Sequence, residues 1–292
     1  MSSPCVPGES KITQLQTNPY LSVVIPCYNE ERRLPATLSK VTSYLRGQQY
    51  GAEVIVVDDG SSDHTADLVE QLVAANSHDA QPGCVTPALR VIRNEHRGKA
   101  FAVRTGMLAA AGQFVLFTDA DGATPIEETD KLLPRLVEGF DVAVGSREGR
   151  EARRFGEPSY RHIMGRVFNL IVQLLAVPGI HDTQCGFKAF RRAAARDLFS
   201  NLQLYTPDTT GPVKGAMVTG FDVEILFLAR KWGYRMVEVP VHWYYGTESK
   251  VNPVKDTWRN LRDVLLVRWN DLRGRYSEPP RHQAHKEKTG SG

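Results

Sequence analysis

The strongest constraint on the fold is that short apolar runs alternate with amphipathic helical patterns through the first half of the chain. Helical periodicity appears at 34–45, 68–73 and 100–111. Between these segments lie runs with the length and apolar content of buried strands, at 21–26, 53–57, 89–92, 114–118 and 141–145. Because such crossovers join parallel strands, we expect an α/β fold with a doubly wound, mostly parallel sheet.

The pattern changes after Ser146. We expect one further strand at 236–243 and helices at 163–177, 191–199, 221–232 and 255–272. The polar stretch 203–219 contains Pro and Gly and is a candidate mobile lid. We expect the segment 1–19 and the polar tail 273–292 to be disordered, which leaves a single folded domain over 20–272.

Composition argues against several classes of protein. The 292 residues include 36 basic and 33 acidic ones, a net charge of +3, so we expect no nucleic-acid partner. The four cysteines form no C-x-x-C pair, which argues against a zinc site or disulfide framework and favours a reducing compartment. The first residues lack a secretory signal, and the most apolar segment, 163–177, is too short and too interrupted to span a bilayer.

Acidic side chains follow several of the expected strands. Asp58 and Asp59 come after the second strand, and Asp119 and Asp121 after the fourth. The carboxyl ends of strands in such sheets form the ligand-binding edge. Adjacent carboxylates repel one another unless a cation compensates, and their oxygens suit Mg²⁺ or Mn²⁺ bridging phosphates. We therefore interpret Asp119 and Asp121 as metal ligands, whereas Asp63 is interpreted as the cap of a helix.

Other nucleotide-binding classes lack their motifs here. No G-x-G-x-x-G follows the first strand, which argues against a dinucleotide-dependent oxidoreductase. No phosphate-binding P-loop is present either, because Gly98-Lys99 is followed by Ala100. Lys99 at the start of a helix is either an ordinary solvated lysine or a ligand for a diphosphate.

Three segments, VVIPCYNE at 23–30, VVDDGS at 56–61 and DAD at 119–121, resemble those of family 2 glycosyltransferases with the GT-A fold. DGATP at 121–125, DTQCGFK at 182–188 and FDVE at 221–224 resemble the dolichyl-phosphate β-glucosyltransferase branch. The likeness extends from about 20 to 270. It implies a nucleotide-sugar half over 20–145 and an acceptor half over 146–272.

The resemblance also implies roles for individual residues. Asp58 or Asp59 would hold the uracil or ribose, and the D-x-D of Asp119 and Asp121 would hold the ribose and metal. Related mannosyltransferases have Gln two positions later, where Ala123 stands here, so the resemblance implies no third side-chain ligand at this position. The implied nucleotide-sugar site comprises Pro26, Tyr28, Glu30, Asp58, Asp59, Lys99, Asp119, Ala120 and Asp121.

A lipid-phosphate acceptor needs cationic positioning more than a general base, because a phosphate monoester is largely dianionic at neutral pH. Guanidinium groups suit this task. Family likeness favours Arg147, Arg161 and Arg166 as phosphate ligands, whereas for Arg150, Arg153 and Arg154 a solvated loop is an equal alternative, since glutamates interleave.

Three acidic residues of the second half have alternative interpretations. Asp182 resembles a base or acceptor-orienting carboxylate, or it caps a turn. Asp222 and Glu224 either face sugar hydroxyls or begin a helix, where acidic residues are favoured.

We therefore expect an inverting transferase that moves glucose from UDP-glucose to dolichyl- or another polyprenyl-phosphate with Mg²⁺ or Mn²⁺. Asp121, Asp182 and Arg147 are the catalytic candidates. The alternatives are a mannosyltransferase using GDP-mannose and a nucleotide-sugar-binding module without turnover. We expect a cytoplasmic protein held peripherally at the cytosolic face of a membrane, with 163–177 either at the membrane interface or packed in the core.

Overall fold

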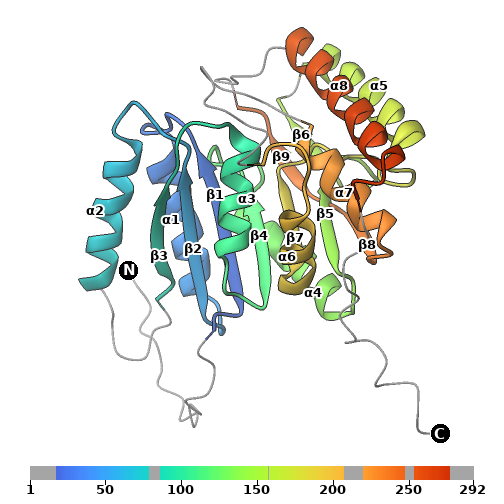
Figure 1. Cartoon of the computed structure of the whole chain (residues 1–292). Helices are drawn as coiled ribbons and strands as arrows, with labels where there is room; N and C mark the ends of the chain where they lie inside the picture. The colour runs from blue at the N-terminus through green and yellow to red at the C-terminus, as the bar shows by residue number, and fades with distance from the viewer. Residues whose placement is uncertain (1–17, 79–85, 157, 207–219, 247–252, 277–292) are drawn as a thin grey trace, which may run out of the picture.

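A computed structural model describes residues 18–78, 86–156, 158–206, 220–246 and 253–276, and shows a seven-stranded sheet flanked by helices (Figure 1). The strand order is β3-β2-β1-β4-β7-β5-β8, and every strand is parallel to the others except β7. The expected doubly wound, mostly parallel α/β sheet is confirmed. The strands are β1 (Leu21–Cys27), β2 (Ala52–Asp58), β3 (Ala88–Arg93), β4 (Phe114–Thr118), β5 (Val142–Ser146), β7 (Phe187–Arg191) and β8 (Met236–Pro240).

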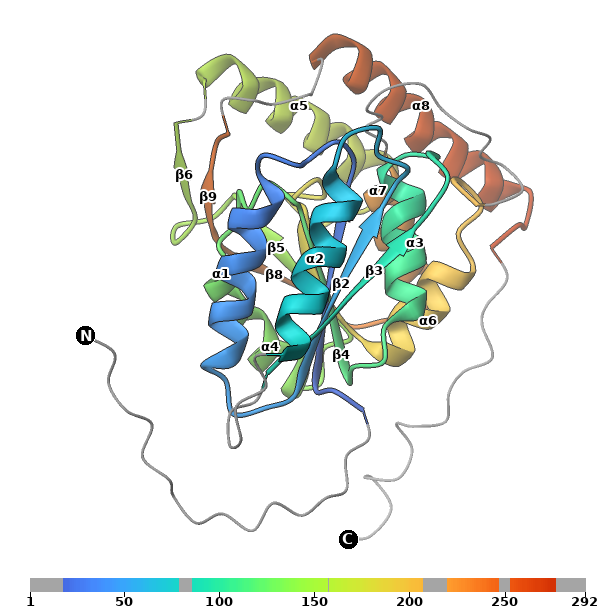
Figure 2. The same ribbon diagram turned by 90° about the vertical axis from the view of Figure 1, so that its left-hand side faces the viewer.

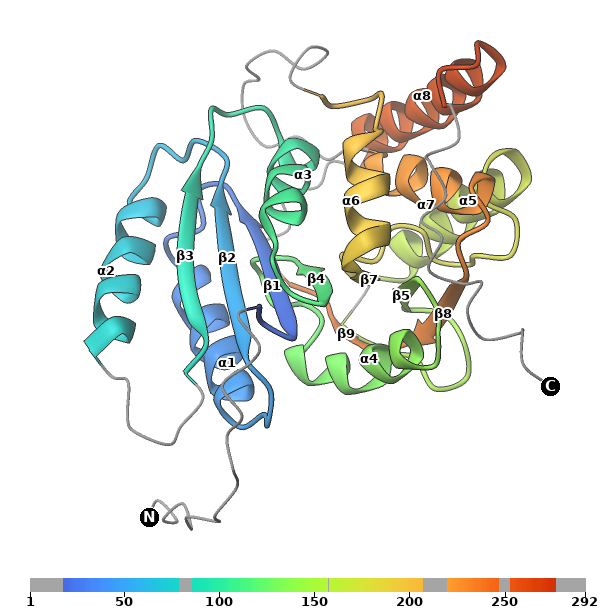
Figure 3. The same cartoon turned by 60° about the horizontal axis from the view of Figure 1, so that its bottom comes forward.

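Two hydrophobic cores form because successive side chains of a strand point to opposite faces of the sheet. Val23 and Ile25 of β1 pack with α1 and α4 on one face, whereas Val24 packs with α3, α6 and α7 on the other (Figures 1 and 3). The helices are α1 (Leu34–Arg46), α2 (Thr65–His78), α3 (Lys99–Ala109), α4 (Thr129–Val137), α5 (Ser159–Leu175), α6 (Arg192–Ser200), α7 (Phe221–Lys231) and α8 (Pro253–Leu272).

Two parts of the fold differ from the sequence-based expectation. Strand β7 enters antiparallel between β4 and β5, whereas we expected no strand there. The expected strand 236–243 is divided: Pro240, which has no backbone N–H, ends β8, and the chain continues as β9 (His242–Tyr244). Strand β9 pairs in parallel with β6 (Arg153–Phe155) outside the main sheet. Most of the candidate lid, 207–219, lies outside the described residues.

The helix pair α5 and α8 lies side by side at the same end of the molecule as the carboxyl ends of the parallel strands (Figures 1 and 2). Phe168 and Val172 of α5 are buried against the core, as are Val264 and Val267 of α8. The core-packing interpretation of 163–177 therefore holds for one face of α5. Among the described residues, no helix has the length and apolar character needed to cross a bilayer.

Glu224 anchors the start of α7 to two other segments. Its buried carboxylate accepts hydrogen bonds from the backbone N–H groups of Gln203 and Leu204 and from the Tyr276 hydroxyl, at 2.7, 3.1 and 2.8 Å. Burial raises the pKa of Glu224 to about 7. Glu224 is thus a structural anchor, and the packed chain extends to the buried Tyr276, past the expected boundary at 272. The remainder of the expected tail, 277–292, is outside the described residues.

The raised pKa of Glu224 predicts a pH dependence of stability. The folded chain binds this proton more tightly than the unfolded chain, so the contribution is complete below about pH 4.5 and is lost as pH rises through about 7. Glu224→Gln does not titrate. Between pH 5 and pH 8 we expect the wild type to lose about 2 kcal/mol of unfolding free energy relative to E224Q, measured by urea denaturation. A difference that is constant with pH would contradict the assignment.

Candidate active site

The candidate site lies at the carboxyl edge of the sheet. Residues that follow β1, β2, β4 and β5 meet there because these strands are parallel (Figure 1). The antiparallel β7 begins at this same edge, where its Phe187 pairs with Thr118 at the end of β4. The segment Cys185-Gly186 is thereby brought beside the turn that contains Asp119.

The turn after β4 holds the two carboxylates of the D-A-D motif. Asp119 forms an ion pair with Lys99, the first residue of α3, with Oδ1 and Nζ 2.5 Å apart. The Thr37 hydroxyl donates to the carbonyl of Ala120 at 2.8 Å, and the backbone N–H of Ala123 donates to Asp121 at 3.0 Å. The structure therefore brings together Lys99, Asp119 and Asp121.

Glycine at 186 permits this arrangement. A Cβ atom at this position would overlap both carboxylate oxygens of Asp119, so the carboxylate lies directly on the backbone of Gly186. Any other residue at 186 would therefore force the Asp119 carboxylate to move from its position in the turn after β4.

Electrostatics at the turn favour a cationic ligand. Desolvation raises the pKa of Asp121, and repulsion by Asp119 raises it further. Burial alone would lower the pKa of Lys99, but Asp119 and Asp222 outweigh it and raise that pKa. Lys99 is thus a charged counterion for Asp119, and a second cation near Asp121 would relieve the repulsion between the two carboxylates.

These residues fit a divalent metal shared with a diphosphate. Within the described ranges, no group of three or more His, Cys, Asp or Glu residues could hold a metal ion by itself. Mg²⁺ is commonly bound by one or two carboxylates together with substrate phosphates, which is the donor set that Asp119 and Asp121 offer. Ala123 adds no side-chain ligand, and its carbonyl already accepts from the backbone N–H of Tyr244 at 2.8 Å.

Asp58 and Asp59 are buried, and each organises a backbone turn. Asp58 accepts hydrogen bonds from the hydroxyl and backbone N–H of Ser61. Asp59 accepts from the backbone N–H groups of Arg97 and Gly98, at 3.0 and 2.8 Å, and contacts His96 Nδ1 at 2.8 Å. Burial raises the pKa of Asp59. A direct contact of either carboxylate with uracil or ribose stays a prediction.

The remaining residues expected in the nucleotide pocket, Tyr28, Glu30 and Pro26, lie at or near the end of β1. The Tyr28 ring stacks on the His96 imidazole, with centroids 3.8 Å apart. Glu30 forms a two-pronged ion pair with Arg33, at 2.7 and 2.6 Å, and Pro26 is buried within β1. His96 was missed by sequence reasoning, because its link to Asp59 joins the ends of β2 and β3.

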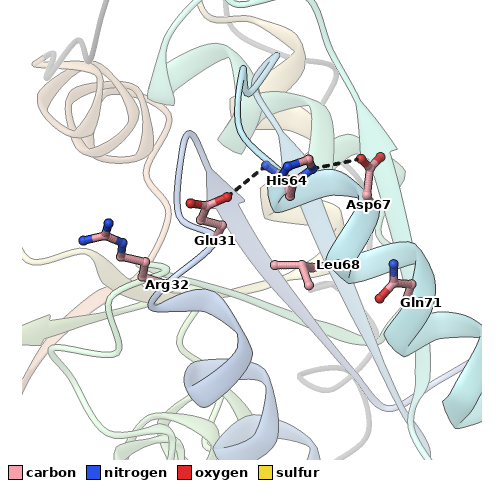
Figure 4. Close-up of a pocket in the computed structure, with 6 residues that line it drawn as sticks. All are labelled: Glu31, Arg32, His64, Asp67, Leu68 and Gln71. Carbon is pink, nitrogen blue, oxygen red and sulfur yellow. Dashed lines mark hydrogen bonds and ion pairs between the residues drawn. The ribbon is translucent and has the colours of Figure 1, made fainter.

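A polar hollow lies between the starts of α1 and α2 (Figure 4). The His64 backbone N–H donates to Glu31 at 3.1 Å, and its ring lies 3.7 Å from Asp67. Next to this hollow, Asp63 accepts a hydrogen bond from the N–H of Thr65, the first residue of α2, which agrees with the capping interpretation. No residue lining the hollow belongs to the Asp119–Asp121 turn.

Arg147 and Asp182 form a second, rigid charged unit. The guanidinium donates to both carboxylate oxygens, from Nε at 2.7 Å and from an Nη at 2.8 Å, and the Arg147 backbone N–H donates at 2.9 Å. Burial would raise the pKa of the fully buried Asp182, but Arg147 outweighs it and holds that pKa well below its usual range. This geometry favours the orienting interpretation of Asp182 over a base.

Glu238 on β8 stabilises the turn that carries Asp182. The sequence analysis did not identify this role of Glu238. Its carboxylate accepts hydrogen bonds from the backbone N–H groups of His181 and Asp182 and from the Ser146 hydroxyl, at 3.0, 2.8 and 2.6 Å. Glu238 thereby fixes the turn that presents Asp182 to Arg147.

The other arginines lie in different surroundings. Arg154 is held by the Arg147 carbonyl and Glu148, whereas Arg150, Arg153 and Arg166 are exposed to solvent. Arg161 is in α5, but its side chain lies outside the described part. Phosphate binding by Arg161 and Arg166 stays a prediction.

The chain belongs to glycosyltransferase family 2. A sequence model described as Glycosyl transferase family 2 matches residues 22–199. The expected GT-A fold is also confirmed by solved structures with this architecture.

Among curated relatives, the dolichyl-phosphate beta-glucosyltransferase of Drosophila melanogaster is 38% identical over 259 residues, covering 85% of this chain and 74% of that protein. The human protein of that name is 34% identical over 266 residues, covering 87% and 76%.

Two solved structures illustrate the shared fold. Mannosyl-3-phosphoglycerate synthase from Rubrobacter xylanophilus has a TM-score of 0.57 at 19% identity, covering 89% of this chain and 77% of that one. Glucosyl-3-phosphoglycerate synthase from Mycobacterium tuberculosis, in complex with Mn²⁺, UDP-glucose and phosphoglyceric acid, has a TM-score of 0.55 at 19% identity, covering 90% and 82%.

The buried Arg147–Asp182 pair predicts a large cost for removing its negative partner. Asp182→Asn leaves the guanidinium facing a neutral group, and we expect a loss of about 3 kcal/mol in unfolding free energy, measured by urea denaturation. Asp67→Asn is the matched control, because Asp67 pairs with Arg93 at 2.8 Å on the exposed surface and should contribute little. Equal effects of the two substitutions would contradict this account.

Proposed function

We propose that this chain transfers glucose from UDP-glucose to dolichyl-phosphate or another polyprenyl-phosphate, with inversion at the anomeric carbon. The observation that carries the proposal is the Asp119–Asp121 turn at the carboxyl edge of the sheet, beside Lys99. The names of the Drosophila and human relatives support the donor sugar and the lipid acceptor.

In this reaction a phosphate oxygen of the lipid is the nucleophile. It attacks the anomeric carbon, and the electron pair of the breaking carbon–oxygen bond goes to the departing UDP. Attack from the opposite side converts an α-linked donor into a β-linked product. No proton needs to be removed from a dianionic phosphate, so Asp182 has no required role as a base.

The residues of the chain then have distinct tasks. Arg147, held rigid by Asp182, binds the acceptor phosphate and aims it at the sugar. Lys99 stands beside Asp119 where the diphosphate charge develops. Asp119 and Asp121 would hold Mg²⁺ or Mn²⁺, which when bound stabilises the leaving diphosphate as a Lewis acid.

A donor screen with Asp121→Asn tests this proposal. We expect UDP release from UDP-glucose only with a polyprenyl-phosphate and a divalent ion, and a loss of at least about 100-fold in kcat for D121N. Glu127→Gln, an exposed residue nearby, is the control and should retain activity. Transfer from GDP-mannose instead would favour the mannosyltransferase alternative, and nucleotide binding without transfer from any donor would favour a binding module.

We also propose that the outer faces of α5 and α8 contact the cytosolic surface of a membrane. On α5, Val167, Leu170 and Leu174 are spaced three and four residues apart, so they share one exposed face. On α8, Trp258, Leu265 and Trp269 share another. Leu174 and Trp258 are 77% and 73% exposed.

The chemistry of this surface suits lipid better than water. Tryptophan rings favour the level of lipid headgroups, and the exposed Arg166 and Arg262 can approach anionic lipids. The position of the helix pair near the carboxyl edge of the sheet would let a membrane-bound phosphate reach the site without leaving the bilayer surface.

Charged substitutions on this surface test the contact. In cosedimentation with vesicles of phosphatidylcholine and phosphatidylserine, we expect Leu170→Glu/Leu174→Glu to bind at least about tenfold more weakly, because two leucines no longer enter the apolar layer. Val137→Glu, at an exposed apolar position on α4, should bind as the wild type does. Equal binding by all three proteins would exclude this face.

A further inference from the structure

Lys188 is a fully buried lysine with no role in the reaction as derived above. It is the second residue of β7 and lies on the sheet face that Phe190 also occupies. Its Nζ donates to Asp222 Oδ1 at 2.5 Å and to the carbonyl of Cys185 at 2.6 Å, and it lies 5.3 Å from the centre of the Phe117 ring. One ammonium thus links β4, α7 and the segment that precedes β7.

The first link leads to the peptide on which Asp119 rests. By binding the Cys185 carbonyl, Lys188 fixes the Cys185-Gly186 peptide, and the Asp119 carboxylate lies directly on Gly186. Any shift of this peptide changes the surface that supports Asp119.

The second link leads to the cation beside Asp119. Asp222 binds Lys188 and also interacts electrostatically with Lys99, whose Nζ pairs with Asp119. The charges alternate in the order Asp119, Lys99, Asp222 and Lys188. Removing the charge at the buried end leaves Asp222 to be compensated by Lys99 alone, which draws Lys99 away from Asp119.

We propose that Lys188 is a positioning residue for Asp119, acting through the Cys185-Gly186 peptide and through the Asp222–Lys99 pair. This inference rests on the proposed function, in which Asp119 and Asp121 hold the metal with the UDP diphosphate. Lys188 would act on the metal-binding Asp119 through other residues, and groups of this kind typically change metal affinity by about 10- to 100-fold.

The test measures Mn²⁺ binding in the presence of UDP, by the loss of the electron paramagnetic resonance signal of free Mn²⁺. For Lys188→Met we expect at least about tenfold weaker Mn²⁺ binding by the folded protein. Lys231→Met is the matched control. Lys231 also pairs with an aspartate, with its Nζ 2.7 Å from Asp271 Oδ1, but this pair lies away from the site. The K231M variant should therefore bind Mn²⁺ as the wild type does.

A double variant separates positioning from stability. Lys188→Met alone leaves Asp222 buried without its partner, which can prevent folding, whereas Lys188→Met/Asp222→Asn removes both charges. We expect the double variant to recover unfolding free energy but to keep the weak Mn²⁺ binding, because the Cys185 carbonyl still lacks its donor.

The outcomes distinguish the inference from the proposed function. Wild-type Mn²⁺ affinity in a folded K188M variant would overturn the positioning role alone. Wild-type affinity in the double variant would overturn the link through the Cys185 carbonyl. Absence of UDP-dependent Mn²⁺ binding in the wild type would overturn the metal-diphosphate proposal, and the positioning role with it.

Discussion

The repulsion between carboxylates gathered at one sheet edge is the constraint on which the rest of the site depends. Parallel strands bring their carboxyl ends together, so the residues after β2 and β4 include several acidic groups in a small volume. The chain offsets the charge of Asp119 with Lys99 and that of Asp222 with Lys188. Of Asp119, Asp121 and Asp222, Asp121 is the carboxylate whose charge is least compensated. Binding of an external cation is therefore most favourable beside Asp121.

On the proposed acceptor side, which contains Arg147 and Asp182, the carboxylate is paired with an arginine. Asp182 is fully buried and paired with Arg147, whose side chain is 17% exposed, while Glu238 holds the turn that carries Asp182. A buried carboxylate here gives orientation to an arginine, which matches the needs of a dianionic nucleophile. In the proposed reaction, the donor side would offer the carboxylates of Asp119 and Asp121 to a metal, and the acceptor side would offer the oriented Arg147 guanidinium to a phosphate.

Local patterns were sufficient to predict the parallel strands and the acidic turns that follow them. The position of Asp119 and Asp121 at the carboxyl end of β4 could be predicted because the strand and its turn are contiguous in sequence. Strand β7 and the role of Lys188 could not, because an antiparallel strand inserted between β4 and β5 depends on pairing across long sequence separations. FKAFR at 187–191 is short and carries a charged residue at the buried Lys188, whereas the expected strands were apolar runs.

The antiparallel insertion of β7 has a chemical consequence. A parallel strand between β4 and β5 would end at the carboxyl edge, whereas β7 begins there, so the residues before it enter the site as a tight backbone segment. In that segment, Gly186 provides the backbone against which the Asp119 carboxylate packs, and the Cys185 carbonyl accepts a hydrogen bond from Lys188. The same reversal places Lys188, the second residue of β7, two positions after Gly186. The strand direction that local sequence did not predict is thus what would allow a buried lysine to position the partly buried carboxylate of Asp119.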